Sequence, residues 1–310
     1  MTTELIERSF QAGAPARLLL KNIRGRVEIL GGEGDQITIS AAIHTSTGNA
    51  NLTRVEIEQA ADGSVSAITH YDGRTWFGLG WLQPSKVDYS VRLPRQCQLE
   101  VSCVECSVRV QNLDGDLQIK LVSGSLSLED LSGTLAFSTV SGGIKGEGLV
   151  GPLRVKTVSA GVHLKRSRFP SVHAKTVSGG LTLETSFGEG PYSFDSVSGS
   201  TRLYLPVNTR CSLQFHSISG GVQSDLGEAR RFHGSGRVRF DIGGGGAELN
   251  YKSVSGGLYL LPGAPAPDAP DSEEDIPESE GLTADERRDI LERIERGELS
   301  AGEALEALRG

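Results

Sequence analysis

Residues 121–180 read "LVSGSLSLEDLSGTLAFSTVSGGIKGEGLVGPLRVKTVSAGVHLKRSRFPSVHAKTVSGG", and the tripeptide Val-Ser-Gly, or a near copy, returns throughout this stretch. The serine of the tripeptide falls at Ser123, Ser141, Ser159, Ser178, Ser198, Ser219 and Ser255. The first five steps are 18 to 21 residues long and the last is 36. Because the last step is about twice the others, we expect it to hide one degenerate repeat. Periodicity of this length is typical of a solenoid.

Alternation around this serine predicts two strands in each repeat. Six and four residues before the serine, the columns are apolar, and three residues before it the column is polar. The inward columns are Leu117, Leu135, Leu153, Val172, Tyr192, Leu213 and Leu249, then Ile119, Phe137, Val155, Ala174, Phe194, Phe215 and Tyr251. A second alternating run follows the tripeptide. A period of two indicates strands with one buried face.

The predicted fold is all-β, a parallel β-helix-like solenoid with coils of about 18–21 residues. One such coil cannot bury its own apolar face, whereas stacked coils about 4.8 Å apart place like residues on like. In this interpretation Val-Ser-Gly is a corner that every coil repeats. With Glu105 in the serine column, the register extends upstream to Leu99. A propeller is disfavoured because its blades need about 40 residues.

The composition divides the chain into three parts: a β-solenoid domain at 1–261, a linker at 262–281 and a helical hairpin at 282–310. The linker is rich in proline and acidic residues, which predicts an extended, disordered segment. Thr283 with Glu286 and Ser300 with Glu303 form two capping boxes, which indicate two short helices. The hairpin is too small to hold a core alone. Its apolar side chains are therefore expected to dock on another copy or on a partner protein: Leu282, Ile290, Leu291, Ile294, Leu305 and Leu308.

The stretch "YDGRTWFGLGWLQPS" at residues 71–85 contains both tryptophans of the chain. It lies between two predicted strands and is rich in large apolar side chains. One interpretation is a plug over the end of the solenoid, which needs a cap to hide its edge. The other is a contact with a partner or with a membrane surface. The candidate contact residues are Trp76, Phe77, Leu79, Trp81 and Leu82.

The residues that could carry chemistry do not assemble into a known catalytic or metal pattern. Cys103 and Cys106 have the spacing of half a zinc site. Cys97 lies too far from Cys103 along one extended strand, and Cys211 lies too far along the predicted stack, for either to complete the site. Buried thiols are therefore expected, with no metal and no cofactor. The outward lysine column, which includes Lys156, is read as a solvated strand face or as a weak surface for an anionic glycan. We predict that the protein is not an enzyme.

Charge and hydropathy restrict the partners and the location. The net charge is −8 and the pI is about 5.4, which argues against nucleic acid and against adsorption to anionic lipid. No stretch has the length and apolarity of a signal h-region or a membrane-spanning helix. The expected location is the cytoplasm, with surface association left open.

The stretch "VDYSVRLPRQCQLEVSCVECSVRVQNLDGDLQIKLVSGSLSLEDLSGTLAFSTVSG" resembles the bacterial β-strand-repeat family named "putative adhesins". The stretch "IGGGGAELNYKSVSGGLYL" is similar to the final coil of that family, and the resemblance covers about residues 15–261. The tail "RGELSAGEALEAL" is similar to a short helical module that accompanies some members. The resemblance implies a non-enzymatic role related to the cell envelope, including envelope stress responses.

The sequence thus predicts a non-catalytic scaffold or protein-interaction protein that self-associates through the C-terminal hairpin. The alternative is a carbohydrate-binding or carbohydrate-modifying β-helix protein. Clustered acidic or aromatic side chains along several coils would favour that alternative.

Overall fold

The computed structural model describes residues 3–48, 50–71, 83–188, 190–226, 230–233 and 236–263. These residues form eighteen strands and one short 3-10 helix, Ala50–Leu52. They fall into two compact units. Unit 1 is Met1–Ser138 with Gly142–Lys145, and unit 2 is Thr139–Ser141 with Gly146–Gly310. The all-β prediction is confirmed, while the predicted linker from 264 onward and the helical hairpin lie outside the described residues.

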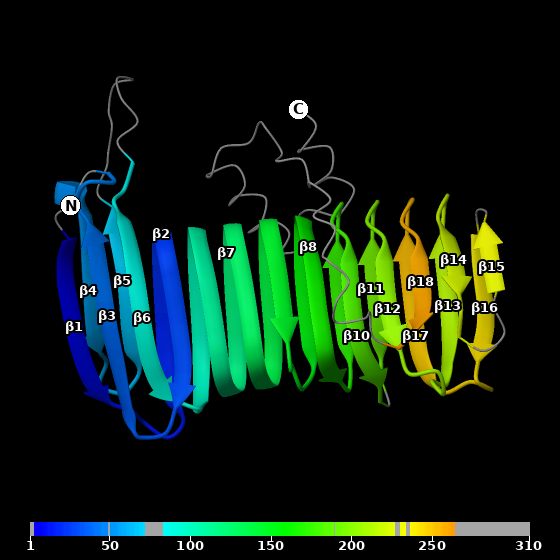
Figure 1. Ribbon diagram of the computed structural model, residues 1–310, viewed down its shortest axis with the longest axis horizontal. Helices are drawn as coiled ribbons and strands as arrows, with labels where there is room; N and C mark the ends of the chain where they lie inside the picture. The colour runs from blue at the N-terminus through cyan, green and yellow to red at the C-terminus, as the bar shows by residue number, and fades with distance from the viewer. Residues whose placement is uncertain are drawn as a thin grey trace. The chain divides into compact units, whose positions relative to one another are not determined.

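Unit 1 is a stack of coils whose strands pair in parallel, except near its N-terminal end, where neighbouring strands run antiparallel (Figure 1). Its strands are β1 (Thr3–Gln11), β2 (Ala16–Gly32), β3 (Gln36–His44), β4 (Thr53–Gln59), β5 (Val65–Tyr71), β6 (Lys86–Pro94) and most of β7 (Gln96–Glu147). β2 pairs in parallel with the first coil of β7, with Leu18 opposite Leu99 and Val27 opposite Val108. β5 and β6 pair in parallel with the other edge of β2. β4 is antiparallel to β5, and β3 is antiparallel to β6 and β1.

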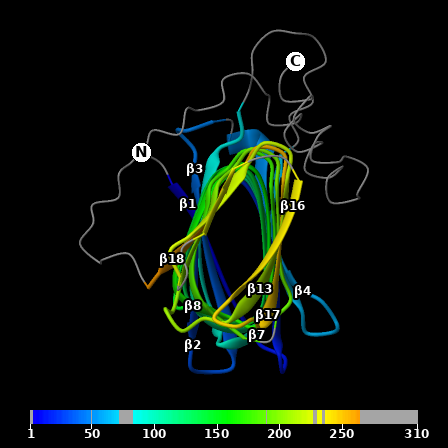
Figure 2. The ribbon, with the colours of Figure 1, turned by 90° about the vertical axis from the view of Figure 1, so that its right-hand side faces the viewer.

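Unit 2 has two walls of parallel strands, which Figure 2 shows with β18 on one wall and β13 and β17 on the other. Its strands are β8 (Leu153–Phe169), β9 (Val172–Thr176), β10 (Leu181–Phe187), β11 (Tyr192–Ser196), β12 (Thr201–Leu205), β13 (Cys211–Ser217), β14 (Gly221–Ser224), β15 (Arg230–His233), β16 (Gly236–Ile242), β17 (Ala247–Ser253) and β18 (Leu258–Pro262). One wall contains β9, β11, β17 and β13. The other contains β10, β12, β18 and β14.

The last coil of unit 2 is out of sequence order. β17 lies between β11 and β13, and β18 lies between β12 and β14 (Figure 1). The expected degenerate repeat between Ser219 and Ser255 is therefore wrong. In its place β15 runs antiparallel to β14, and β16 runs antiparallel to β13. Gly243, Gly244 and Gly245, all with positive φ, then turn the chain back into β17, because glycine adopts such backbone angles without steric cost.

The inward columns that the alternation predicts are confirmed. Every member of both columns is buried, from Ala174 at 4 % exposure down to Tyr251 at 0 %. None of the side chains in the polar column is buried. In unit 2 the rings of Phe215 and Tyr251 stack with centroids 5.4 Å apart. The core thus consists of apolar residues at equivalent positions in neighbouring coils, which stack on one another because one face of each short strand is apolar.

Close approach of the coils explains the glycine of the tripeptide. A Cβ added to Gly199 would lie 2.0 Å from the carbonyl oxygen of Gly179 in the next coil, far inside van der Waals contact. Gly142 meets the carbonyl of Gly124 in the same way and also has a φ of +112°. At these corners the backbones approach too closely for a side chain on the glycine. Ala160 and Cys106 occupy the same position in two other coils, so the close approach requires glycine in most coils but not in all.

The hydroxyl column two residues before the tripeptide serine satisfies the backbone at the same corner. Ser196 Oγ donates to the carbonyl of Gly199 at 2.7 Å, and Thr176 Oγ1 accepts from Gly179 N at 3.2 Å. The threonines also contact each other along the stack, with Thr157 Oγ1 donating to Thr176 Oγ1 at 2.9 Å. Buried polar groups must be hydrogen-bonded to avoid a large desolvation cost. This requirement explains why the column is serine or threonine.

Candidate functional site

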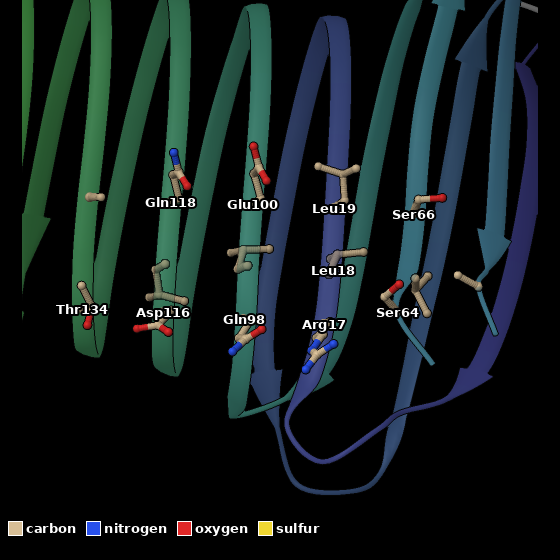
Figure 3. A pocket seen from close by; sticks show the side chains of 15 residues that line it. Arg17, Leu18, Leu19, Ser64, Ser66, Gln98, Glu100, Asp116, Gln118 and Thr134 are labelled. Carbon is tan, nitrogen blue, oxygen red and sulfur yellow. The ribbon is translucent and has the colours of Figure 1, made fainter. Parts of the chain in front are cut away.

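A groove with a volume of about 690 Å³ crosses the outer face of unit 1. It runs over β5, β2 and the first coils of β7, as Figure 3 shows. Its lining residues include Arg17, Leu19, Ser64, Ser66, Gln98, Glu100, Asp116, Gln118, Thr134 and Ala136. Several segments that are far apart in sequence therefore contribute to one surface.

The parallel register places these side chains in two rows. Arg17 is opposite Gln98, and Leu19 is opposite Glu100. Successive coils of β7 repeat after 18 residues, as shown by the Ser107–Ser125 hydroxyl contact of 2.9 Å. One row is Arg17, Gln98, Asp116 and Thr134, and the other is Ser66, Leu19, Glu100, Gln118 and Ala136 (Figure 3). Alternate residues of each strand face outward, and neighbouring strands lie about 4.8 Å apart. The members of each row therefore follow one another across the strands at about this spacing.

The groove carries few charges and many hydrogen-bonding groups. Its ionisable side chains are Arg17, Glu100 and Asp116. Arg17 Nη1 lies 3.7 Å from Asp62 Oδ2 at the rim, where both side chains are half exposed. Hydrogen bonds from Ser64, with the Arg17 charge, hold the pKa of Asp62 below its ordinary value. Arg17 therefore has a partner at the rim, and the acidic groups Glu100 and Asp116 face the groove.

Beneath the outer face, unit 1 contains a buried polar cluster. Asn22, which is 2 % exposed, donates from Nδ2 to the Val87 carbonyl at 2.8 Å and accepts from Thr69 Oγ1 at 3.0 Å. Thr69 also contacts the Tyr89 hydroxyl at 2.8 Å. Burial raises the pKa of Tyr89 to about 12. These hydrogen bonds satisfy polar groups in the interior, so the cluster stabilises the coil that β5 and β6 form.

The four cysteines are free and buried. The hydrogen bond between the side chains of Cys103 and Cys106 raises the pKa of Cys106, and burial raises it further. Burial likewise raises the pKa of Cys97 to about 12 and that of Cys211 to about 11. Thiols with raised pKa values stay protonated and are poor nucleophiles and metal ligands. Among the described residues, no group of three or more Cys, His, Asp or Glu is placed to hold a metal ion.

The partner-binding residues predicted from sequence lie outside the described part of the chain. This holds for Trp76, Phe77, Leu79, Trp81 and Leu82, and for Leu282, Ile290, Leu291, Ile294, Leu305 and Leu308. The described residues end at Tyr71, the last residue of β5, and resume at Gln83 before β6, where Ser85 N donates to Thr53 Oγ1 at 3.0 Å.

The groove residues were missed by sequence reasoning. The signal was present in the columns five and seven residues before the serine, which hold Glu100 and Gln118, then Gln98, Asp116 and Thr134. No helix in the described residues is long and apolar enough to cross a membrane.

A family model described as Toastrack DUF4097 matches residues 17–258 of the chain. A solved "putative adhesin" from Bacteroides fragilis has a similar fold, with a TM-score of 0.50 and 13 % identity over 83 % of this chain and 97 % of that one. A "putative lipid binding protein" from Parabacteroides distasonis matches with a TM-score of 0.42 and 12 % identity over 84 % and 96 %. No match was found among curated proteins.

Proposed function

Since the chain belongs to the Toastrack DUF4097 family, we propose that it is a non-catalytic interaction protein whose groove in unit 1 binds a partner. The observation that carries the proposal is the pair of side-chain rows, which present hydrogen-bonding groups on five neighbouring strand segments. An adhesin name, as its structural neighbour carries, fits an interaction role. Sites that orient a ligand with a few fixed polar groups are usual for binding surfaces.

The groove chemistry favours a polar protein segment. Glu100 and Asp116 accept hydrogen bonds and attract positive charge, while Gln98 and Gln118 both donate and accept. A partner strand that crosses the coils would meet one such group about every 4.8 Å. A basic or amide-rich extended segment therefore fits better than an acidic one.

A carbohydrate is the second candidate. Amide and carboxylate side chains in the groove are suited to hydrogen-bond sugar hydroxyls. Among the described residues that line the groove, however, none is aromatic, so a sugar ring would have no stacking surface. For this reason we rank the protein partner first.

Charge reversal in the groove tests this function. The double variant Glu100→Lys with Asp116→Lys should lose the partner that the wild type retains in a pull-down from cells. Glu129→Lys is the matched control, because Glu129 is an exposed acid outside the groove that pairs with Gln111. If both variants retain the same partners as the wild type, the groove is not the binding site.

We further propose that residues 282–310 drive self-association. The support is the apolar stripe of the predicted hairpin, since each large apolar side chain left in water forfeits roughly 1.5–3 kcal/mol. Ile294→Asp in the full chain should reduce the particle mass in light scattering to that of a monomer. Glu292→Asp, on the opposite side of the predicted helix, should leave the mass unchanged. An equal mass for wild type and Ile294→Asp would contradict the proposal.

A role in the envelope stress response and a cytoplasmic location complete the proposal. The resemblance to envelope-linked relatives supports the first, and the second is the expectation that the fractionation experiment below tests. Deleting the gene should change the output of an envelope-stress reporter, and fractionation should recover the protein with soluble cytoplasmic markers. An unchanged reporter, or recovery outside the cytoplasm, would contradict the respective part.

A further inference from the structure

One outer wall of unit 2 is strongly basic, although the whole chain has a net charge of −8. The wall consists of β8, β9, β11, β17, β13 and β16, which pair side by side in that order. We call its two outward rows the basic face. They are Arg154, His173, Ser193, Asn250, Gln214 and Arg239, then Lys156, Lys175, Asp195, Lys252, His216 and Arg237.

The register places the cations of the basic face against one another. Lys156 is directly opposite Lys175, and His216 lies between Lys252 and Arg237. Like charges opposite each other on neighbouring strands are destabilising. Burial and then the charge of Lys175 lower the pKa of His173, as expected for an imidazole among cations.

The acidic groups of this wall compensate only part of the charge. Of the described residues in the two rows, Asp195 alone is acidic, and its carboxylate lies 4.0 Å from Lys175 Nζ. In the adjacent row Asp241 accepts a hydrogen bond from Ser212 at 2.7 Å, and Glu248 is exposed. Six lysine and arginine side chains thus face these three carboxylates, which leaves net positive charge across the strands.

The same chain contains an anionic segment of matching size. Residues 264–281 carry seven acidic side chains and no lysine or arginine. The acids are Asp268, Asp271, Glu273, Glu274, Asp275, Glu278 and Glu280. Twelve residue steps from the first to the last of them span up to about 40 Å when extended. Six strands about 4.8 Å apart make a face about 24 Å wide, so the segment is long enough to cross it.

The acidic segment also begins in the right place. β18 ends at Pro262, and Gly263 N donates to the Leu205 carbonyl at the end of β12. From that corner residues 206–210 carry the chain across to β13 on the basic wall. The five residue steps from Gly263 to Asp268 span up to about 18 Å when the chain is extended. A tether this short gives an effective concentration in the millimolar range.

We propose that the acidic segment 268–280 lies across the basic face of unit 2 of its own chain, as a built-in competitor for other anionic chains. This cover masks the basic face from anionic polymers without any change in the strands. The proposal is independent of the groove in unit 1 and of the hairpin at 282–310. Removal or neutralisation of the acids should therefore uncover a surface for anionic chains.

Zero-length coupling of carboxylates to amines in the full chain tests the contact directly. At low salt, carbodiimide treatment should link Lys156, Lys175 or Lys252 to acids within 268–280, and mass spectrometry identifies the linked peptides. High salt should suppress these links, since ionic contacts are screened. Lys145, an exposed lysine of unit 1, reports non-specific coupling. Absence of links above the Lys145 level at low salt overturns the proposal.

An equal mixture of nitrogen-15-labelled and unlabelled protein identifies the source of the segment. The proposal requires that linked peptides come from the same molecule and carry the same label. Linked peptides of mixed label at the statistical frequency would show that the segment comes from a second copy, and would overturn the intramolecular proposal.

Competition with a peptide provides the second measurement. A fluorescent peptide of residues 264–281 is titrated with the wild type and with a full-length variant in which the seven acids are replaced by their amides. The variant should bind the peptide about tenfold or more tightly than the wild type, because the tethered competitor is lost. Adding Lys156→Glu and Lys252→Glu to the variant should abolish this gain. Equal affinity of wild type and amide variant overturns the proposal.

Discussion

The corner glycines provide a sharp test of how the coils stack. Gly199→Ala introduces a methyl group 2.0 Å from the Gly179 carbonyl oxygen and 2.9 Å from its carbon. Contact between these atoms normally occurs beyond 3 Å, so neighbouring coils must separate by about 1 Å. Overpacking in a rigid interior typically costs 1–3 kcal/mol. Separation also weakens the hydrogen bond at this corner from Ser198 N to the Val177 carbonyl, which is 2.8 Å long. We therefore expect Gly199→Ala to lower the free energy of unfolding by about 3 kcal/mol.

Gly180→Ala is the matched control in the same part of the stack. Its nearest neighbour would be the Ser200 carbonyl oxygen at 4.0 Å, and its φ is not in the left-handed region. Replacement of such a glycine stabilises a protein by about 0.4–1 kcal/mol through the unfolded chain. Thermal unfolding followed by circular dichroism should show a Tm about 6–12 °C lower for Gly199→Ala, at roughly 2–4 °C per kcal/mol. Equal Tm values for the two variants would refute the close-approach explanation.

Three further predictions follow from buried side chains. Phe137→Ala, at 1 % exposure, should cost about 3–5 kcal/mol, whereas Lys156→Ala on the outer wall should be near neutral; equal shifts in urea unfolding would contradict the register. Cys103→Ser should retain the fold, and the purified wild type should contain no stoichiometric zinc; one zinc per chain that disappears in the variant would contradict the structural role of the thiols. Burial raises the pKa of Tyr89 to about 12, so the unfolded chain, with an ordinary pKa near 10, releases its proton first. Stability should therefore fall as the pH rises from 10 to 12, and Tyr89→Phe should make this decline shallower in urea unfolding.

The sequence was sufficient to predict the coils because their alternation is strict. Apolar columns such as those of Leu117 and Ile119 reappear in every repeat, and only a stack buries them all. The role of the corner was also predictable, since Gly recurs where the chain must turn. The coil of β2 was harder to recognise, because it lacks the tripeptide although Leu18 and Val27 align with the columns of β7.

The order of the coils in unit 2 could not be predicted from periodicity. Columns of like residues make the coils nearly interchangeable, so the register of Leu249 fits beside Tyr192 and beside Leu213 alike. The groove in unit 1 was missed for a related reason. Its residues come from β5, β2 and β7, and they meet only once the pairing of these strands is known.

The out-of-order coil has a consequence for synthesis on the ribosome. β11 and β13 emerge well before β17, which must later enter between them. Until β17 is synthesised, the edges of β11 and β13 that will pair with it have no partner strand. Unpaired strand edges can pair with the edges of other chains. Tyr192 is opposite Leu249, which lies far along the chain, and strand pairs with such long sequence separation form slowly. The strands on either side of the final coil can therefore complete their pairing only after β17 and β18 have been synthesised.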